Sequence, residues 1–408
     1  MIPPFDIVLQ IIELVKEDEE ILKALALASP VFVELCQERL FESIEIQANF
    51  KAEHDSAPPP ASFIKFHAVV TKNPRIPSYI QEIKLAQHST RGQHTMAEVV
   101  DQLALITQVF DALSSSPIHT LSFLSHGKVR WTDLDLRIRS SLLKILQKPC
   151  FQHISLHELH FPRYLFSHFT HLQSVKLYSP RFPWEQDSPL TRMHQISQLT
   201  YYVHPDAGIP WSLDTHTFDC VGPSIGLDLS SLQYLDLNVD LLQIPRLSHL
   251  FQLPKLTHLE VSTDPSSTLG FSLSLGSAPS LRLSGLANLT HLTLTNLVFD
   301  SSIDQFKWIR KALASLTTAQ LQIIHSVTIV LRATSDAIGK IAEFEDVLLL
   351  ARCLSHLHRS SVGVKSILVH MKISESNEDT ILLAQGKISP LLAWEGCESV
   401  FQFKIESN

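Results

Sequence analysis

Two stretches of this sequence, PKLTHLEV at residues 254–261 and ANLTHLTL at residues 287–294, decide its fold class. Both end in a run in which polar and apolar residues alternate, which is the period of a β-strand with one buried face. SLQYLDL at residues 231–237 and HLQSVKL at residues 171–177 have the same order of apolar anchors. A strand segment that recurs along a chain predicts a fold built by repeating one small unit.

The pattern of three apolar anchors recurs over most of the chain, and its third anchor falls at intervals of 21 to 40 residues. The third anchors are Leu85, Phe123, Leu156, Leu177, Tyr201, Leu237, Val261, Leu294, Ile329, Val369 and Ile405. In the longer intervals, apolar residues three and four apart predict helices at residues 96–113, 303–324 and 341–359. This alternation of strands and helices predicts an α/β fold with parallel strands.

The L-x-x-L-x-L pattern of these segments resembles the strand of leucine-rich repeats. The resemblance implies an irregular leucine-rich-repeat solenoid over residues 62–408, with parallel strands on the concave side and helices and loops on the convex side. Leucine-rich repeats usually have an asparagine a few residues after the third anchor. Here that asparagine is mostly missing, and only Asp240 and Asn296 lie near its position. An ordinary α/β domain with a parallel sheet is the alternative.

Strand alternation predicts which residues of this region face outward. The residues just before and after the second and third anchors share the face opposite to the anchors. They are mostly polar, of mixed charge, with scattered tyrosines and histidines, as expected of a surface that recognises a protein; a merely solvated sheet face is the alternative. The candidate target-binding residues are Lys176, Tyr178, Tyr234, Asp236, His258, Glu260, His291 and Thr293.

Residues 1–46 predict a small module of three helices. A wide apolar stripe runs through residues 4–16, a charged break follows, and Pro30 begins a third helical segment that leads into a short strand. This segment holds ten acidic and three basic residues, and therefore −7 of the chain's net charge of −8. Three helices in so few residues form a marginal core, so the module either caps the larger domain or buries apolar surface against another protein.

Three pieces of this module, in this order and spacing, resemble the F-box of fungal F-box proteins. They are the apolar pattern from Pro4 to Leu14, LKALALASPVF at residues 22–32 and RLFESIEI at residues 39–46. The resemblance implies that the module binds a Skp-family adaptor and, through it, a cullin. By the same resemblance, the adaptor-binding residues are Pro4, Ile7, Val8, Ile11, Leu27 and Phe32.

Composition excludes several classes of protein. Residues 47–61, polar and rich in proline, predict a linker or exposed loop between the two regions. The negative net charge argues against nucleic-acid binding, and no apolar run is long enough for a membrane span. Five cysteines that are far apart, with no C-x-x-C pair, indicate a reducing compartment, and no signal peptide is recognisable. We therefore expect a cytoplasmic or nuclear protein.

Motifs for catalysis or for metal binding are missing from the sequence. The densest histidine cluster, at His153, His157 and His160, lies in a run that alternates like a strand, which separates the side chains. There is no phosphate-binding glycine loop and no H-E-x-x-H motif. We expect no catalytic residue, cofactor or metal, and a substrate-receptor subunit of an SCF-type E3 ubiquitin ligase. The alternatives are an interaction scaffold whose F-box-like module only caps the solenoid, and an enzyme of unrecognised type.

Overall fold

The computed structural model describes residues 5–48, 61–87, 96–178, 193–202, 227–238, 247–248, 250–263, 281–298, 306–334, 345–360, 363–374, 381–382 and 401–407. The protein is a mixed α/β molecule with long runs of parallel strands and several helices, as the strand–helix alternation predicted. It divides into two compact units. Unit 1 holds Met1–His194 with Pro223–Leu227, and unit 2 holds Gln195–Gly222 with Asp228–Asn408.

Unit 1 begins with three short helices, α1 (Phe5–Val15), α2 (Glu19–Ala28) and α3 (Pro30–Phe41). Asp18 starts α2 by accepting a hydrogen bond from the backbone N–H of Ile21 at 3.0 Å, which satisfies one of the free donors of a helix N-terminus. Pro30 occupies the first turn of α3, where its missing N–H costs nothing. The buried side chains of Ile12, Leu22 and Cys36 join the three helices into one small core.

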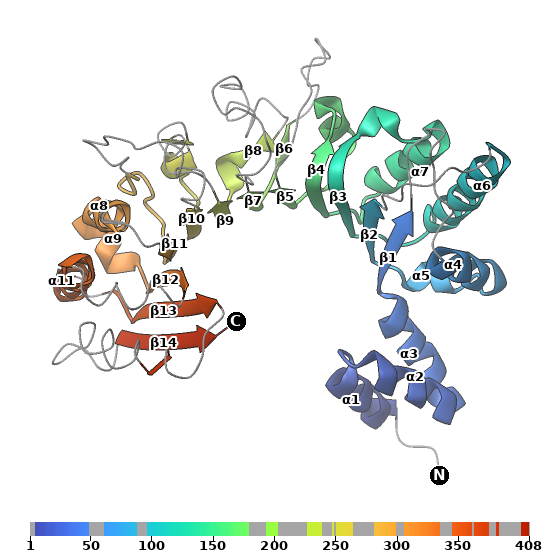
Figure 1. The fold of residues 1–408 in the computed structure, drawn as a ribbon, viewed down its shortest axis with the longest axis horizontal. Coiled ribbons are helices and arrows are strands. Elements are labelled where there is room, and N and C mark those ends of the chain that lie inside the picture. Colours follow the sequence, from blue (N-terminus) through green and yellow to red (C-terminus); the bar gives the residue numbers. More distant parts are fainter. Residues whose placement is uncertain are drawn as a thin grey trace. The chain divides into compact units, whose positions relative to one another are not determined.

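The rest of unit 1 contains five parallel strands that pair in chain order. The strands are β1 (Ser43–Ala48), β2 (Glu82–Gln87), β3 (Thr120–Arg130), β4 (His153–His160) and β5 (Ser174–Tyr178). Figure 1 shows the helices between these strands gathered on one side of the sheet. These helices are α4 (Ala61–Lys72), α5 (Ile76–Tyr79), α6 (Met96–Leu113) and α7 (Leu136–Leu146), with 3₁₀ turns η1 (Trp131–Asp133) and η2 (Arg163–His168).

Unit 2 contains seven parallel strands in chain order. They are β7 (Gln198–Tyr202), β9 (Tyr234–Asn238), β10 (His258–Thr263), β11 (His291–Val298), β12 (Ser326–Thr334), β13 (Ser366–Ser374) and β14 (Phe401–Ser407). Its described helices are α8 (Lys307–Ala314), α9 (Thr318–Ile323) and α11 (Glu345–Ser360), with the 3₁₀ turn η4 (Leu229–Ser231). The two-residue strands β6 (His194–Gln195) and β8 (Leu227–Asp228) fall where the chain passes between units.

The strand registers within the two units confirm ten of the eleven predicted third anchors. Within unit 1, paired strands place Leu85, Phe123, Leu156 and Leu177 in one buried row. Within unit 2, a second row contains Tyr201, Leu237, Val261, Leu294, Ile329 and Val369. The prediction for Ile405 is wrong: Phe403 pairs with Val369, and Ile405 pairs with Met371. In FQFKIE the apolar residues recur every second position, so the template fits at two registers two residues apart.

The helix predictions are confirmed with one exception. Residues 96–113 form α6, and residues 345–360 form α11 where residues 341–359 were predicted. The single helix predicted at residues 303–324 is wrong, because α8 ends at Ala314 and Thr317 starts α9 with a capping box. Strand β1 continues through Ala48 into the predicted linker, and residues 49–60 lie outside the described residues. No described helix is both long and apolar enough to span a membrane.

Candidate protein-binding surfaces

The predicted adaptor-binding residues divide between surface and core of the helical module. Leu27 is 89% exposed and Ile7 is 46% exposed, so both can contact a partner. Ile11 and Phe32 are half-buried, and Phe32 packs against the core of Ile12, Leu22 and Cys36. The last two predicted residues are Val8, which is fully buried, and Pro4, which lies outside the described residues. The prediction for Val8 is therefore wrong.

The apolar surface of this module is larger than the sequence indicated. The described part of the protein has twelve exposed large apolar side chains, and six of them belong to α1 and α2. Besides Ile7 and Leu27, these are Phe5 at 62%, Leu9 at 41%, Leu14 at 85% and Ile21 at 43% exposure. Soluble proteins scatter single apolar residues over their surface, whereas a concentration of them on one element marks an interaction site.

A groove between α1 and α3 adds shape to this apolar surface. Its volume is about 330 Å³, and Leu9, Ile12 and Leu35 supply its apolar lining. Its polar rim consists of Gln10, Glu13, Glu38 and Arg39. Arg39 is held in place by Glu13 at 3.2 Å and by Glu42 at 3.0 Å. An apolar floor with a polar rim fits one inserted apolar side chain of a partner protein.

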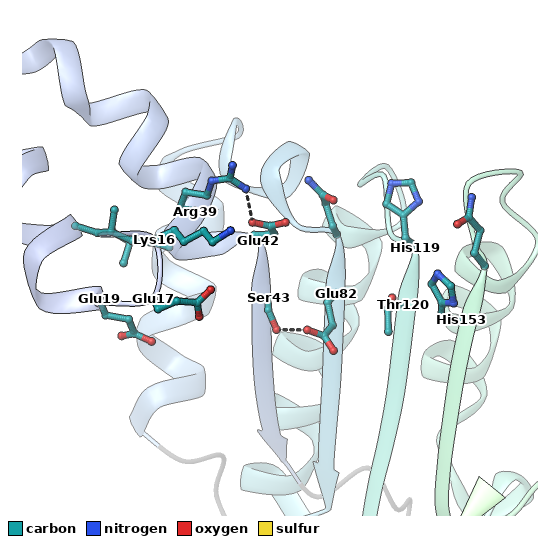
Figure 2. Close-up of a pocket in the computed structure, with 14 residues that line it drawn as sticks. Lys16, Glu17, Glu19, Arg39, Glu42, Ser43, Glu82, His119, Thr120 and His153 are labelled. Atoms are coloured by element: carbon teal, nitrogen blue, oxygen red, sulfur yellow. Dashed lines mark hydrogen bonds and ion pairs between the residues drawn. The ribbon is translucent and has the colours of Figure 1, made fainter. Parts of the chain in front are cut away.

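A larger cleft lies between the helical module and the first strands of the sheet (Figure 2). Its volume is about 750 Å³. On the sheet side, the Ser43 hydroxyl donates a hydrogen bond to Glu82 at 2.6 Å, and His153 stands one strand beyond Thr120. The lining residues are Lys16, Glu17, Glu19, Leu22, Arg39, Leu40, Glu42, Ser43, Gln81, Glu82, His119, Thr120, Gln152 and His153. They come from the turn after α1, from α2 and α3, and from the starts of four strands, so no local motif in the sequence predicts the cleft.

Two histidines, His119 and His153, line the sheet side of this cleft. The pKa of His153 is lowered first by burial and then by its neighbours His119 and Lys176, so His153 is neutral at pH 7. His119 uses Nδ1 to bond the backbone carbonyl of Cys150 at 2.8 Å. Among the described residues, no group of three or more His, Cys, Asp or Glu side chains is placed to bind a metal ion. A wide polar cleft of this kind fits an extended, polar segment of another protein.

In unit 1, the predicted target-binding residues Lys176 and Tyr178 lie on β5 and share one face of the sheet. Lys176 is exposed, and the buried Leu177 between them points to the opposite face. The ring of Tyr178 stacks on that of His157 on β4, with centroids 4.0 Å apart and an angle of 11° between the planes. These two residues are therefore placed as predicted, on the side of the sheet away from its buried anchors.

In unit 2, the other six predicted residues form two rows across three neighbouring strands. Tyr234, His258 and His291 pair in one row, and Asp236, Glu260 and Thr293 pair in the next. All six face the same way, because the residues between them in each strand are buried leucines. The prediction that they share a face is confirmed, and the part they play in binding stays a prediction.

Two imidazole rings of this face form a stack that sequence reasoning did not find. The rings of His258 and His291 are 4.1 Å apart and parallel to within 4°. Each ring bonds through Nδ1 to the hydroxyl of the preceding threonine, Thr257 at 2.9 Å and Thr290 at 2.8 Å. Burial lowers the pKa of His291, and His258 and His325 lower it further. The sequence does contain a signal for this stack: His258 and His291 occupy the same place in the L-T-H-L of PKLTHLEV and ANLTHLTL. Equivalent residues of two paired strands become neighbours.

Comparison with known proteins does not extend these observations. No protein-family model matches the chain, and no curated protein has a matching sequence. The residues, their burial and their charges therefore carry the functional argument.

Proposed function

We propose that this protein is a non-catalytic substrate receptor of a cullin-based E3 ubiquitin ligase. In this proposal α1–α3 are an F-box module that binds a Skp-family adaptor, and the strand faces of the two units bind a target protein. The single observation that carries the proposal is the concentration of exposed apolar side chains on α1 and α2. A cytoplasmic or nuclear location belongs to the same proposal.

The energetics of the helical module support a partner. Burying a large apolar side chain stabilises a complex by about 1.5–3 kcal/mol. Leu27 and Leu14 are 89% and 85% exposed, so each has nearly its whole side chain left to bury. A few such residues supply most of the binding energy of a typical interface. The groove lined by Leu9 offers a receptor for an apolar side chain of the adaptor.

The repeated architecture supports the second half of the proposal. Parallel strands of one register, separated by helices and loops, are what an irregular leucine-rich-repeat array contains. Such a receptor needs no catalytic residue of its own. It acts by holding lysines of the target near the ubiquitin-carrying enzyme, which raises their effective concentration.

One observation favours a second function, that of a scaffold whose helical module only caps the sheet. The carbonyl oxygen of Glu42, at the end of α3, accepts hydrogen bonds from the backbone N–H groups of Gln81 and Glu82, both at 2.9 Å. The module thus continues the hydrogen-bond pattern of β1 and β2 and covers one end of the sheet. A cap protects a sheet whether or not another protein binds it.

Co-purification with a Skp-family adaptor separates the two functions. We expect wild-type protein, co-expressed with the adaptor, to retain it, and Leu27→Asp to retain at least about tenfold less, because a carboxylate replaces a buried leucine at the interface. Leu136→Asp is the matched control, since Leu136 is 70% exposed on α7. Circular dichroism should show that both variants are folded. A wild-type chain that retains no adaptor, or a Leu27→Asp chain that retains it fully, would refute the ligase role.

A further inference from the structure

The open face of β3, β4 and β5 differs in charge from the corresponding face of β9, β10 and β11. Each strand contributes three outward residues in register before the sheet becomes irregular. None of the nine is acidic, and eight of them carry a hydrogen-bonding side chain. They are Thr120, Ser122, Leu124, His153, Ser155, His157, Ser174, Lys176 and Tyr178. By contrast, the corresponding face of β9, β10 and β11 has Asp236 and Glu260 and no lysine or arginine.

Lys176 is the one lysine or arginine among these nine outward positions. Its side chain is exposed, and none of the described carboxylates forms an ion pair with it. Strand pairing places Ser155, Ser122 and then Lys84 in the same row. Lys84 is different, because Glu82 lies 3.5 Å from it and neutralises it. An anion that approaches this face therefore meets its strongest attraction at Lys176.

Small hydroxyl side chains form the floor beside Lys176. Ser122 and Ser155 are only 9% and 8% exposed, so they lie low between their larger neighbours. The stacked rings of His157 and Tyr178 stand at one end of this floor, and His157 Nε2 lies 3.1 Å from the Ser155 hydroxyl. The pKa of His153 on this face is lowered first by burial and further by His119 and Lys176. The first acidic residue along β4, Glu158, comes after these positions, at a left-handed φ of 52°.

We propose that this face binds a segment of the target protein through an Asp or Glu side chain, whose carboxylate pairs with Lys176 over Ser122 and Ser155. This inference rests on the proposed function and names the chemical class of its target. One lysine matches the single charge of a carboxylate. A phosphate group carries nearly twice that charge and is typically held by clustered arginines, and the nine outward positions contain none.

A titration with short peptides tests the proposal. The probes are three N-acetylated peptide amides of sequence Gly-Ser-X-Ser-Gly, in which X is glutamate, glutamine or phosphoserine. The full-length chain, labelled at histidine, reports binding through the ring resonances of His153 and His157. We expect the glutamate peptide to bind about threefold to tenfold more tightly than the glutamine peptide, as for one partly exposed charged hydrogen bond.

Substitution of the lysine completes the test. Lys176→Gln should abolish the preference for glutamate over glutamine, and Lys176→Arg should preserve it. Lys144→Gln, at an exposed position of α7 away from this face, has the same change in net charge and should leave the preference intact. Equal binding of the glutamate and glutamine peptides, or equal effects of the two lysine-to-glutamine variants, would overturn the proposal. So would a tighter complex with the phosphoserine peptide, which would assign the face to a phosphate.

The outcome is separable from that of the proposed function. If the adaptor co-purifies but the glutamate preference is absent, only the target class is wrong. If the preference is present but no adaptor is retained, the face binds acidic segments in a protein that is not a ligase subunit.

Discussion

A buried hydrogen bond between β11 and α8 allows a quantitative test of how unit 2 is held together. Asn296 and Trp308 are 2% and 1% exposed, and the indole Nε1–H donates to Asn296 Oδ1 at 3.0 Å. The Thr263 hydroxyl donates to the same oxygen at 3.4 Å. This asparagine therefore joins a neighbouring strand and the following helix to β11 through one acceptor.

The cost of removing that acceptor can be worked out term by term. In Asn296→Ala, the indole N–H is left buried without a partner, which costs about 1–3 kcal/mol. The lost side chain also leaves a small cavity, which adds about 1 kcal/mol. One effect acts the other way: among the described residues, Asn296 Nδ2 has no hydrogen-bond partner, so its removal relieves an unfavourable burial. We expect a net loss of about 2–3 kcal/mol in the free energy of unfolding.

A double-mutant cycle isolates the hydrogen bond from the cavity. Trp308→Phe removes the donor, so in the double variant with Asn296→Ala no indole N–H is left unpaired. We expect a coupling energy of about 1–2 kcal/mol from urea unfolding followed by circular dichroism, analysed for the transition that Trp308→Phe shifts. The control pairs Asn296→Ala with Trp131→Phe, a tryptophan 1% exposed in unit 1, and its coupling should be zero. Strict additivity in the first cycle would show that the hydrogen bond contributes nothing.

Three further predictions concern other parts of the protein. Leu22 is 1% exposed in α2, and Leu22→Ala should lower the free energy of unfolding by about 2–5 kcal/mol. Leu27→Ala on the same helix should change that free energy by less than about 0.5 kcal/mol. A similar loss in both variants would refute the assignment of inner and outer faces. Gly363→Ala should cost about 1–3 kcal/mol in urea unfolding, because the new Cβ overlaps the backbone carbonyl of Gln322, and an unchanged midpoint would contradict this. The pKa of His153 is lowered first by burial and then by His119 and Lys176, so just below its ordinary pKa the unfolded chain binds a proton that the folded chain does not. Stability should therefore fall as pH drops from about 7 toward 5, and His153→Gln should have a shallower slope of unfolding free energy against pH over that window.

Strand positions were the most predictable part of this fold, and the reason is physical. A strand buried on one face must alternate, and a shift by one residue would turn its anchors to solvent, so a segment such as PKLTHLEV permits only one choice of face. A shift by two residues keeps the same face. The error at Ile405 is of this second kind, because Phe401, Phe403 and Ile405 all suit the buried row.

Surfaces that combine residues from several elements were less predictable. The cleft in Figure 2 joins Lys16 and Glu19 of the helical module to His119 and His153 of two strands, which lie about a hundred residues further along the chain. Only the folded chain brings them together. The asparagine near the end of β11 was visible in the sequence as a position of interest, but its bond to Trp308 depends on where α8 packs. The apolar periodicity of a segment predicts whether it forms a helix or a strand, but it does not predict which other helix or strand packs against it.

The helical module shows where periodicity fails and why that failure is informative. An α-helix of α1's length can bury one face, yet apolar residues cover most of its circumference. The interior takes Val8 and Ile12, and the remaining apolar residues, among them Leu14, have no place inside. A concentration of exposed apolar residues on one element is typical of an interaction surface. The same excess that made Val8 a wrong choice of contact residue is what leads us to propose a binding partner for α1 and α2.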